Sequence, residues 1–186
     1  MSDLAGLKGS WNDLSNECII CQLTEIRCMP DAHFACCLQA AEGYLALNMP
    51  LEALEELERF EDGCQSADET IILRIEVLNR LERWDEVLLH CDGALAQNPR
   101  CSKLYLLCAP AVQHVKGTRA AIAFLEKGSF AMPENAEVAF ALAHLLCEAK
   151  EFFDAKDYLM GAFDLDPALR SRAREEQAFE RLWPWL

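Results

Sequence analysis

Cys18 and Cys21 form a Cys-x-x-Cys pair, with the two cysteines one helical turn apart. Of the motifs in this sequence, this pair most directly suggests chemistry. Paired thiolates at this distance can share a metal ion or form a reactive disulfide. A structural zinc site needs four ligands, however, and no second Cys-x-x-Cys or Cys-x-x-His pair follows. We therefore expect no metal site and no cofactor, and keep a metal or thiol-redox sensor at these cysteines as a lesser alternative.

The ten cysteines of the chain would indicate a disulfide framework in a short secreted protein. Here they lie within apolar helical patterns, and the sequence shows neither a signal-type N-terminus nor an apolar run long enough to cross a bilayer. These features predict a cytoplasmic protein with free thiols. We expect Cys91 and Cys108 to be buried where helices meet.

Motifs of catalysis are missing from the sequence: it has no glycine-rich phosphate loop, no Gly-x-Ser-x-Gly and no His-Glu-x-x-His. The four histidines are dispersed, and a lone base without a nucleophile or an orienting group is no active site. The sequence therefore predicts a protein that is not an enzyme. With 31 acidic against 17 basic residues the net charge is −14, which disfavours nucleic acid and anionic membranes as partners.

A 34-residue period organises the chain. Small apolar residues recur at this spacing, as do prolines that close similar phrases; the positions are Ala53, Val87, Ala121, Ala155, and then Pro99, Pro133, Pro167. Apolar residues within each period follow helical spacing on both sides of a short break, which predicts two amphipathic helices per period. One such pair cannot bury its own apolar stripe, so neighbouring pairs must stack and the ends must be capped.

This period resembles the tetratricopeptide repeat, and the third and fourth units carry the resemblance best. Their signature positions hold Tyr105, Cys108, Ala109, Val112, Ala121, Leu125 and Pro133, and Ala139, Leu142, Ala143, Leu146, Ala155, Leu159, Ala162 and Pro167. The resemblance implies an all-α solenoid, a right-handed superhelix of stacked antiparallel helix pairs. The expected segments are an N-terminal helical cap or degenerate repeat at 1–33, units at 34–67, 68–101, 102–135 and 136–169, and a capping helix at 170–186 that buries Phe179, Leu182 and Trp183.

The resemblance also places a partner-binding groove along the first helix of each unit. The residues expected to face it are Leu38, Glu42, Leu45, Glu69, Ile72, Glu76, Asn79, Lys103, Leu106, Gln113, Glu137, Phe140 and His144. Related domains that hold the acidic tails of chaperones use a clamp of Lys, Asn and Arg at such positions, and of that set this chain has only Lys103. The mixture of apolar and acidic residues instead favours a partner with apolar anchors and basic flanks.

The sequence therefore predicts a non-catalytic protein–protein interaction module, a scaffold or adaptor. A secretion chaperone of the tetratricopeptide type, holding an exported client in the groove, is the alternative. Pro110 interrupts the expected first helix of the third unit, removes the hydrogen bond to the Leu106 carbonyl and predicts a kink.

Overall fold

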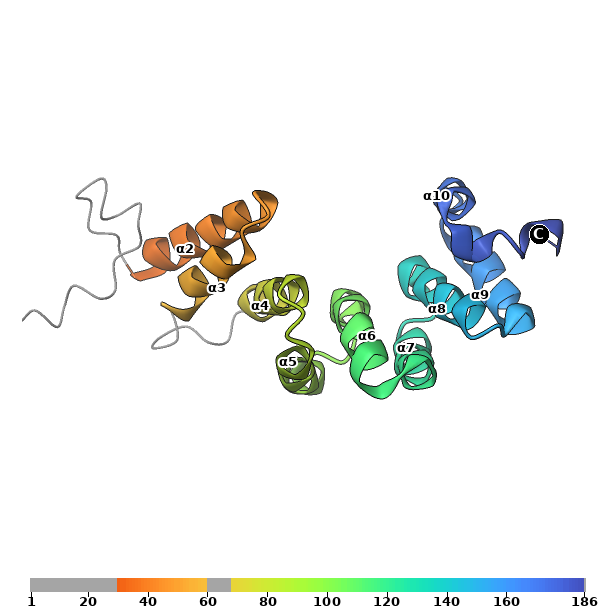
Figure 1. The fold of residues 1–186 in the computed structure, drawn as a ribbon, viewed down its shortest axis with the longest axis horizontal. Helices are drawn as coiled ribbons and strands as arrows, with labels where there is room; N and C mark the ends of the chain where they lie inside the picture. Colours follow the sequence, from red (N-terminus) through yellow and green to blue (C-terminus); the bar gives the residue numbers. More distant parts are fainter. Residues whose placement is uncertain (1–29, 60–67, 186) are drawn as a thin grey trace, which may run out of the picture. The chain divides into compact units, whose positions relative to one another are not determined.

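The computed structural model describes residues 30–59 and 68–185, and every regular element in these ranges is helical, with no strand. This confirms the predicted all-α fold. Figure 1 shows the helices in chain order. They are α2 (Pro30–Ala46), α3 (Pro50–Glu58), α4 (Asp68–Arg80), α5 (Trp84–Gln97), α6 (Ser102–Lys116), α7 (Thr118–Ala131), α8 (Ala136–Glu148), α9 (Phe152–Leu165) and α10 (Leu169–Glu175), followed by the 3₁₀ turns η2 (Gln177–Phe179) and η3 (Trp183–Trp185).

Helix starts follow the 34-residue period. From α4 onward, the first helices of successive pairs begin at Asp68, Ser102 and Ala136, and the second helices begin at Trp84, Thr118 and Phe152. The chain has two compact units that divide after Val77, within α4. In the first, α2 packs against α3; in the second, α5 to α9 pack each against the next along the chain.

Three of the breaks between paired helices share one turn. Asn48, Glu82 and Lys150 adopt the left-handed conformation with φ of 58°, 56° and 66°, and they too follow the 34-residue period. After each, a backbone N–H reaches back five residues; the N–H of Glu151, for example, donates to the carbonyl of Leu146 at 2.9 Å. This geometry satisfies the last carbonyls of the first helix and reverses the chain.

The third pair departs from this pattern. Gly117, at φ 88°, is the whole break between α6 and α7, so α6 is longer than α4 and α8. α6 runs through Pro110, which has no N–H to offer the carbonyl of Leu106. The next carbonyl along α6, that of Leu107, accepts a hydrogen bond of 2.7 Å from the side-chain amide of Asn79 on α4. Asn79, predicted to face a groove, thus bonds to the backbone of α6.

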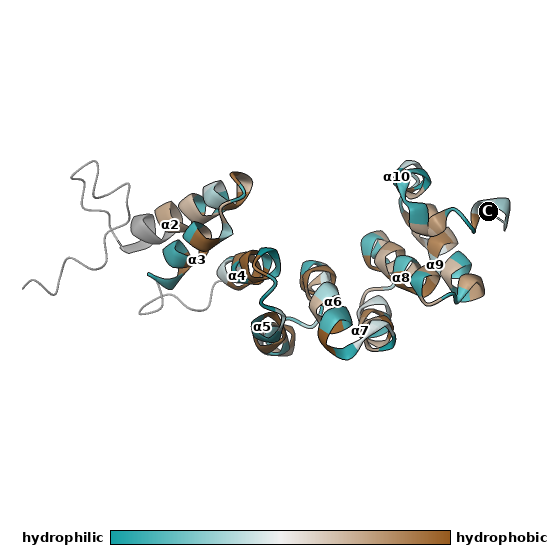
Figure 2. Ribbon diagram, viewed as in Figure 1, coloured by the Kyte–Doolittle hydropathy of each residue, from teal (hydrophilic) through white to brown (hydrophobic). Residues whose placement is uncertain are grey.

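Small residues allow α6 and α7 to approach closely. A Cβ added at Gly128 would lie 2.8 Å from Cδ1 of Tyr105, which is closer than van der Waals contact. Ala121, on the same helix, is fully buried. Figure 2 shows hydrophobic and hydrophilic residues interspersed along the helices. The apolar stripes of α6 to α9 meet in one continuous core.

Two cysteines of the second unit are covalently joined. Cys91 on α5 and Cys108 on α6 form a disulfide with their Cα atoms 6.2 Å apart, so the expectation of free thiols is wrong for this pair. Their predicted burial is confirmed, at 2% and 0% exposed. The positions are 17 residues apart in sequence, and the packing of α5 on α6 brings them within bonding distance. Cys101 and Cys147 are free thiols.

The C-terminal segment covers the end of the core. Phe179 and Leu182 are fully buried in the same cluster as α8 and α9, as predicted, whereas Trp183 is only half-buried against it. The segment is not the single helix that we expected, because α10 ends where Glu176 adopts an extended conformation with φ −90° and ψ 118°. The extended residue turns Phe179 back onto α8, where its ring packs edge-on against Phe140.

The structure does not describe residues 1–29, so most of the expected N-terminal cap at 1–33, including Cys18 and Cys21, lies outside the described residues. The sensor alternative that rests on these two cysteines therefore stays a prediction. None of the helices in the described ranges is both long enough and apolar enough to cross a membrane.

Candidate binding pocket

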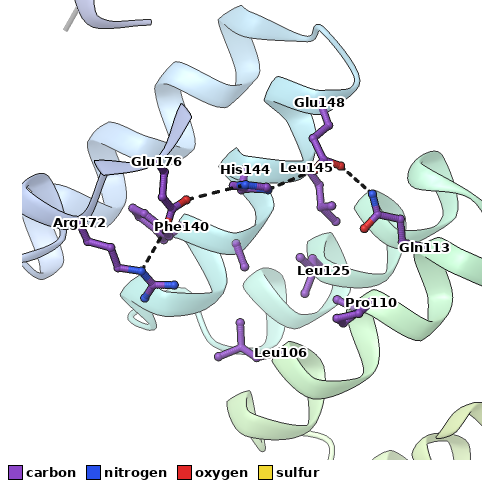
Figure 3. Close-up of a pocket in the computed structure, with 12 residues that line it drawn as sticks. Leu106, Pro110, Gln113, Leu125, Phe140, His144, Leu145, Glu148, Arg172 and Glu176 are labelled. Carbon is purple, nitrogen blue, oxygen red and sulfur yellow. Dashed lines mark hydrogen bonds and ion pairs between the residues drawn. The ribbon is translucent and has the colours of Figure 1, made fainter. Parts of the chain in front are cut away.

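An open pocket of about 360 Å³ lies in the second unit, between α6, α8 and the C-terminal cap. Its volume falls at the lower end of the range of ligand-binding pockets. Figure 3 shows the side chains around it. The lining residues are Leu106, Ala109, Pro110 and Gln113 of α6, Leu125 of α7, Phe140, Ala141, His144, Leu145 and Glu148 of α8, Arg172 of α10, and Glu176.

The floor of the pocket is apolar. Leu125 and Leu145 are buried in the core below it, at 0% and 7% exposed. Leu106 is half-buried and Pro110 is exposed, so both offer apolar surface to a ligand. The floor can therefore accept an apolar side chain.

Phe140 lines the pocket but is only 2% exposed. The guanidinium of Arg172 lies 4.7 Å from its ring centroid, and the ring of Phe179 packs edge-on at 5.1 Å. From the sequence we expected Phe140 to face a partner-binding groove. Its burial shows that it belongs to the core, so truncation would also act on the fold.

Arg172 joins α10 to α8 at one end of the pocket. Its Nη1 donates to Oε2 of Glu137 at 2.9 Å, and its Nε donates to Oε1 of Glu176 at 3.2 Å. All three side chains are partly exposed, which limits what these ion pairs add to stability. They fix the position of the guanidinium over Phe140 and so shape this end of the pocket.

His144 lies between two carboxylates on the rim, as Figure 3 shows. Its Nδ1 is 3.7 Å from Oε1 of Glu148, and its Nε2 is 3.8 Å from Oε2 of Glu176. The amide of Gln113 donates to the other oxygen of Glu148 at 2.6 Å and so connects α6 to α8 across the pocket. The rim therefore combines acidic, basic and neutral hydrogen-bonding groups from three elements.

Cys147 precedes Glu148 on α8. Burial raises the pKa of the Cys147 thiol to about 11, with a smaller contribution from the charge of Glu148, so this thiol is no nucleophile near neutral pH. In the residues described here, no three His, Cys, Asp or Glu side chains are grouped so that they could hold a metal ion.

Four of the predicted groove residues line this pocket: Leu106, Gln113, Phe140 and His144. Glu137 contacts it through Arg172. The remaining predicted residues do not line it; they are Leu38, Glu42, Leu45, Glu69, Ile72, Glu76, Asn79 and Lys103. Of these, Leu45 is buried against the helix pair of the first unit, whereas Glu42, Glu69 and Lys103 are exposed.

Several lining residues were absent from the predicted groove. Glu148 lies one helical turn after His144 on the same face, so extending the helical pattern would have found it. Leu145 directly follows His144 and lies one turn after Ala141, which also lines the pocket. Arg172 and Glu176 had no such signal, because we interpreted their segment only as a cap. Arg172 lies within α10 and reaches the pocket where α10 meets α8, as its ion pair with Glu137 shows. Glu176 lies at the bend where the chain turns back onto α8.

Comparison with known proteins supports the architecture. No family model matches the sequence, and no curated protein matches it. Among solved structures, MamA 41-end from Desulfovibrio magneticus RS-1 aligns with 72% of this chain and 75% of its own, at 19% identity and a TM-score of 0.58. Another MamA structure aligns with 73% of this chain and 79% of its own, at 15% identity and a TM-score of 0.61.

YrrB, described as a tetratricopeptide repeat protein with an unusual peptide-binding site, aligns with 74% of this chain and 72% of its own, at 16% identity and a TM-score of 0.59. At these identities the likeness shows the fold. The chain has the tetratricopeptide-type fold of stacked helix pairs.

Proposed function

We propose that this chain, with its tetratricopeptide-type fold, is a non-catalytic protein–protein interaction module that binds a segment of another protein in the pocket between α6, α8 and the C-terminal cap. One observation carries the proposal: an open cavity of about 360 Å³ has an apolar floor and a charged rim. Buried apolar anchors with a polar rim are the usual anatomy of a protein-binding surface. The peptide-binding site of YrrB, a protein of similar fold, supports the same function.

The partner segment should bring a large apolar side chain to the floor. Leu106 is half-buried and Pro110 is exposed in the unbound protein, so a ligand gains by covering them. The rim has two carboxylates, Glu148 and Glu176, against one guanidinium, Arg172. A partner with a basic residue beside its apolar anchor is complementary to this arrangement.

Site-specific photo-crosslinking in cells tests this proposal and identifies the partner at the same time. Pro110 belongs to the pocket floor, so benzoylphenylalanine at this position lies beside a bound segment, and removing a proline from the middle of α6 favours the helix. The matched control is the same group at Leu89 on α5, which is 73% exposed and does not line the pocket. We expect one partner to be captured from position 110 and not from position 89.

Capture from position 89 alone would assign the interaction to another surface, and equal capture from both would indicate nonspecific contact. A single client at one-to-one stoichiometry, exported from the cell, would favour the secretion chaperone. The redox state of Cys91 and Cys108 in the same cells tests the predicted cytoplasmic location. A disulfide that persists in the cell is typical of an oxidising compartment and would contradict that prediction.

A further inference from the structure

The imidazole of His144 lies on the pocket rim with a carboxylate facing each of its two nitrogens. Nδ1 faces Glu148 at 3.7 Å and Nε2 faces Glu176 at 3.8 Å. The side chains of His144, Glu148 and Glu176 are 36%, 40% and 26% exposed, so a ligand can reach all three. Figure 3 shows the histidine between the two acids at the open side of the cavity.

The charge of this rim depends on the proton of His144. Glu148 and Glu176 are acidic and Arg172 is basic, and the latter is also engaged by Glu137. With a neutral imidazole the carboxylates outnumber the guanidinium, so the rim attracts a cation. A protonated imidazole adds a positive charge within 4 Å of both acids and removes much of that attraction.

We propose that Glu148 and Glu176 bind the arginine or lysine side chain of the partner segment, and that the protonated form of His144 opposes this cation. The inference rests on the proposed function, because it assigns the chemistry of the occupant of the same pocket. The partner's apolar side chain covers Leu106 and Pro110 on the floor, and its cation lies on the rim above them. The site thus favours an apolar residue next to a basic one.

The direction of the pH effect follows from the groups around His144. Histidine changes charge between about pH 5 and pH 8, whereas arginine and glutamate side chains ordinarily keep theirs over this range. Among the described residues, His144 faces Glu148 of α8 and Glu176 of the cap. Arg172 of α10 pairs with Glu176, and the neutral amide of Gln113 on α6 donates to Glu148. Raising the pH therefore strengthens binding of a basic partner.

Two matched dipeptides test the inference without a known partner. Both are N-acetylated and C-amidated; one is phenylalanine–arginine and the other phenylalanine–glutamine. Their dissociation constants are measured from the amide NMR shifts of α6 and α8 residues at about pH 5.5 and about pH 8. We expect the arginine dipeptide to bind about fivefold more tightly at the higher pH and the glutamine dipeptide to be insensitive to pH.

Variants assign the effect to these residues. His144→Gln should abolish the pH dependence for the arginine dipeptide. His114→Gln is the matched control and should leave it unchanged, because His114 is exposed and stacks on Trp84 with ring centroids 4.5 Å apart, outside the pocket. Glu148→Gln and Glu176→Gln should each reduce the preference for arginine over glutamine, whereas Glu126→Gln on an exposed part of α7 should not.

The outcomes separate the two proposals. If both dipeptides shift pocket resonances with equal affinity at both pH values, the pocket binds apolar groups and the cation site is refuted. If the arginine dipeptide binds more weakly at the higher pH, the assigned role of His144 is refuted. If neither dipeptide shifts residues of α6 or α8 at millimolar concentration, the proposed function fails at this pocket, and the inference fails with it.

Discussion

Phe179→Ala tests the claim that the cap holds the end of the helical stack together. The ring of Phe179 is fully buried, packs edge-on against Phe140 at 5.1 Å and approaches the ring of His144 at 5.8 Å. Truncating a buried phenylalanine to alanine costs about 3–5 kcal/mol through lost burial and the cavity left behind. The wall of the pocket adjoins this ring, so we expect a loss of about 3 kcal/mol, the lower end, where partial collapse is easiest.

Urea unfolding measures this loss by far-ultraviolet circular dichroism, with tryptophan fluorescence as a second probe that includes Trp183 and Trp185 of the cap. Phe130→Ala is the matched control, because it deletes the same atoms at a site on α7 that is 91% exposed. It should change the free energy of unfolding by less than about 0.5 kcal/mol. A Phe179→Ala variant as stable as the control would refute the account of the cap.

Three further predictions concern single contacts. Asn135→Ala should destabilise the protein by about 1 kcal/mol, since its side chain accepts a hydrogen bond at the first turn of α8; urea unfolding measures this change, and a change below about 0.3 kcal/mol would contradict it. Reducing the Cys91–Cys108 disulfide should lower the free energy of unfolding by about 3 kcal/mol, because it frees a loop of 17 residues; denaturation with and without reductant checks this, and equal stability would count against the crosslink. The pKa of Cys147 is raised to about 11, so its thiol should react with iodoacetamide more slowly at neutral pH than that of the half-buried Cys101, and its rate should rise toward pH 11. Mass spectrometry of the modified peptides measures both rates. Faster labelling of Cys147 at neutral pH would contradict the prediction.

The period of the sequence predicted the helix breaks well, because the turn between paired helices recurs with it. Asn48, Glu82 and Lys150 occupy the same left-handed position of the 34-residue period, although two of them are residue types with no particular preference for it. The position is set by the packing of the helices on either side. The repeat predicted a short break here, but neither it nor the local residue type predicted the left-handed conformation.

The binding pocket was predictable only in part. Leu106 and His144 lie on helix faces that the repeat pattern identifies, so they could be named from the sequence. Glu176 lies at the bend after α10, which depends on where Phe179 packs rather than on local preference. Arg172 lies within α10 and depends on how that helix meets α8. The Cys91–Cys108 bond depends in the same way on how two helices meet.

The central claim is that a partner segment binds in the pocket between α6, α8 and the cap. Isothermal titration of the crosslinked partner's segment against the wild-type protein and two leucine variants tests it most directly. Leu106→Ala removes apolar surface from the pocket floor, and Leu89→Ala removes the same atoms from an exposed site outside the pocket. We predict that Leu106→Ala weakens binding by more than about 1 kcal/mol, with unchanged circular dichroism, and that Leu89→Ala leaves the affinity unchanged. Equal affinities for all three proteins would contradict the claim and place the interaction on another surface.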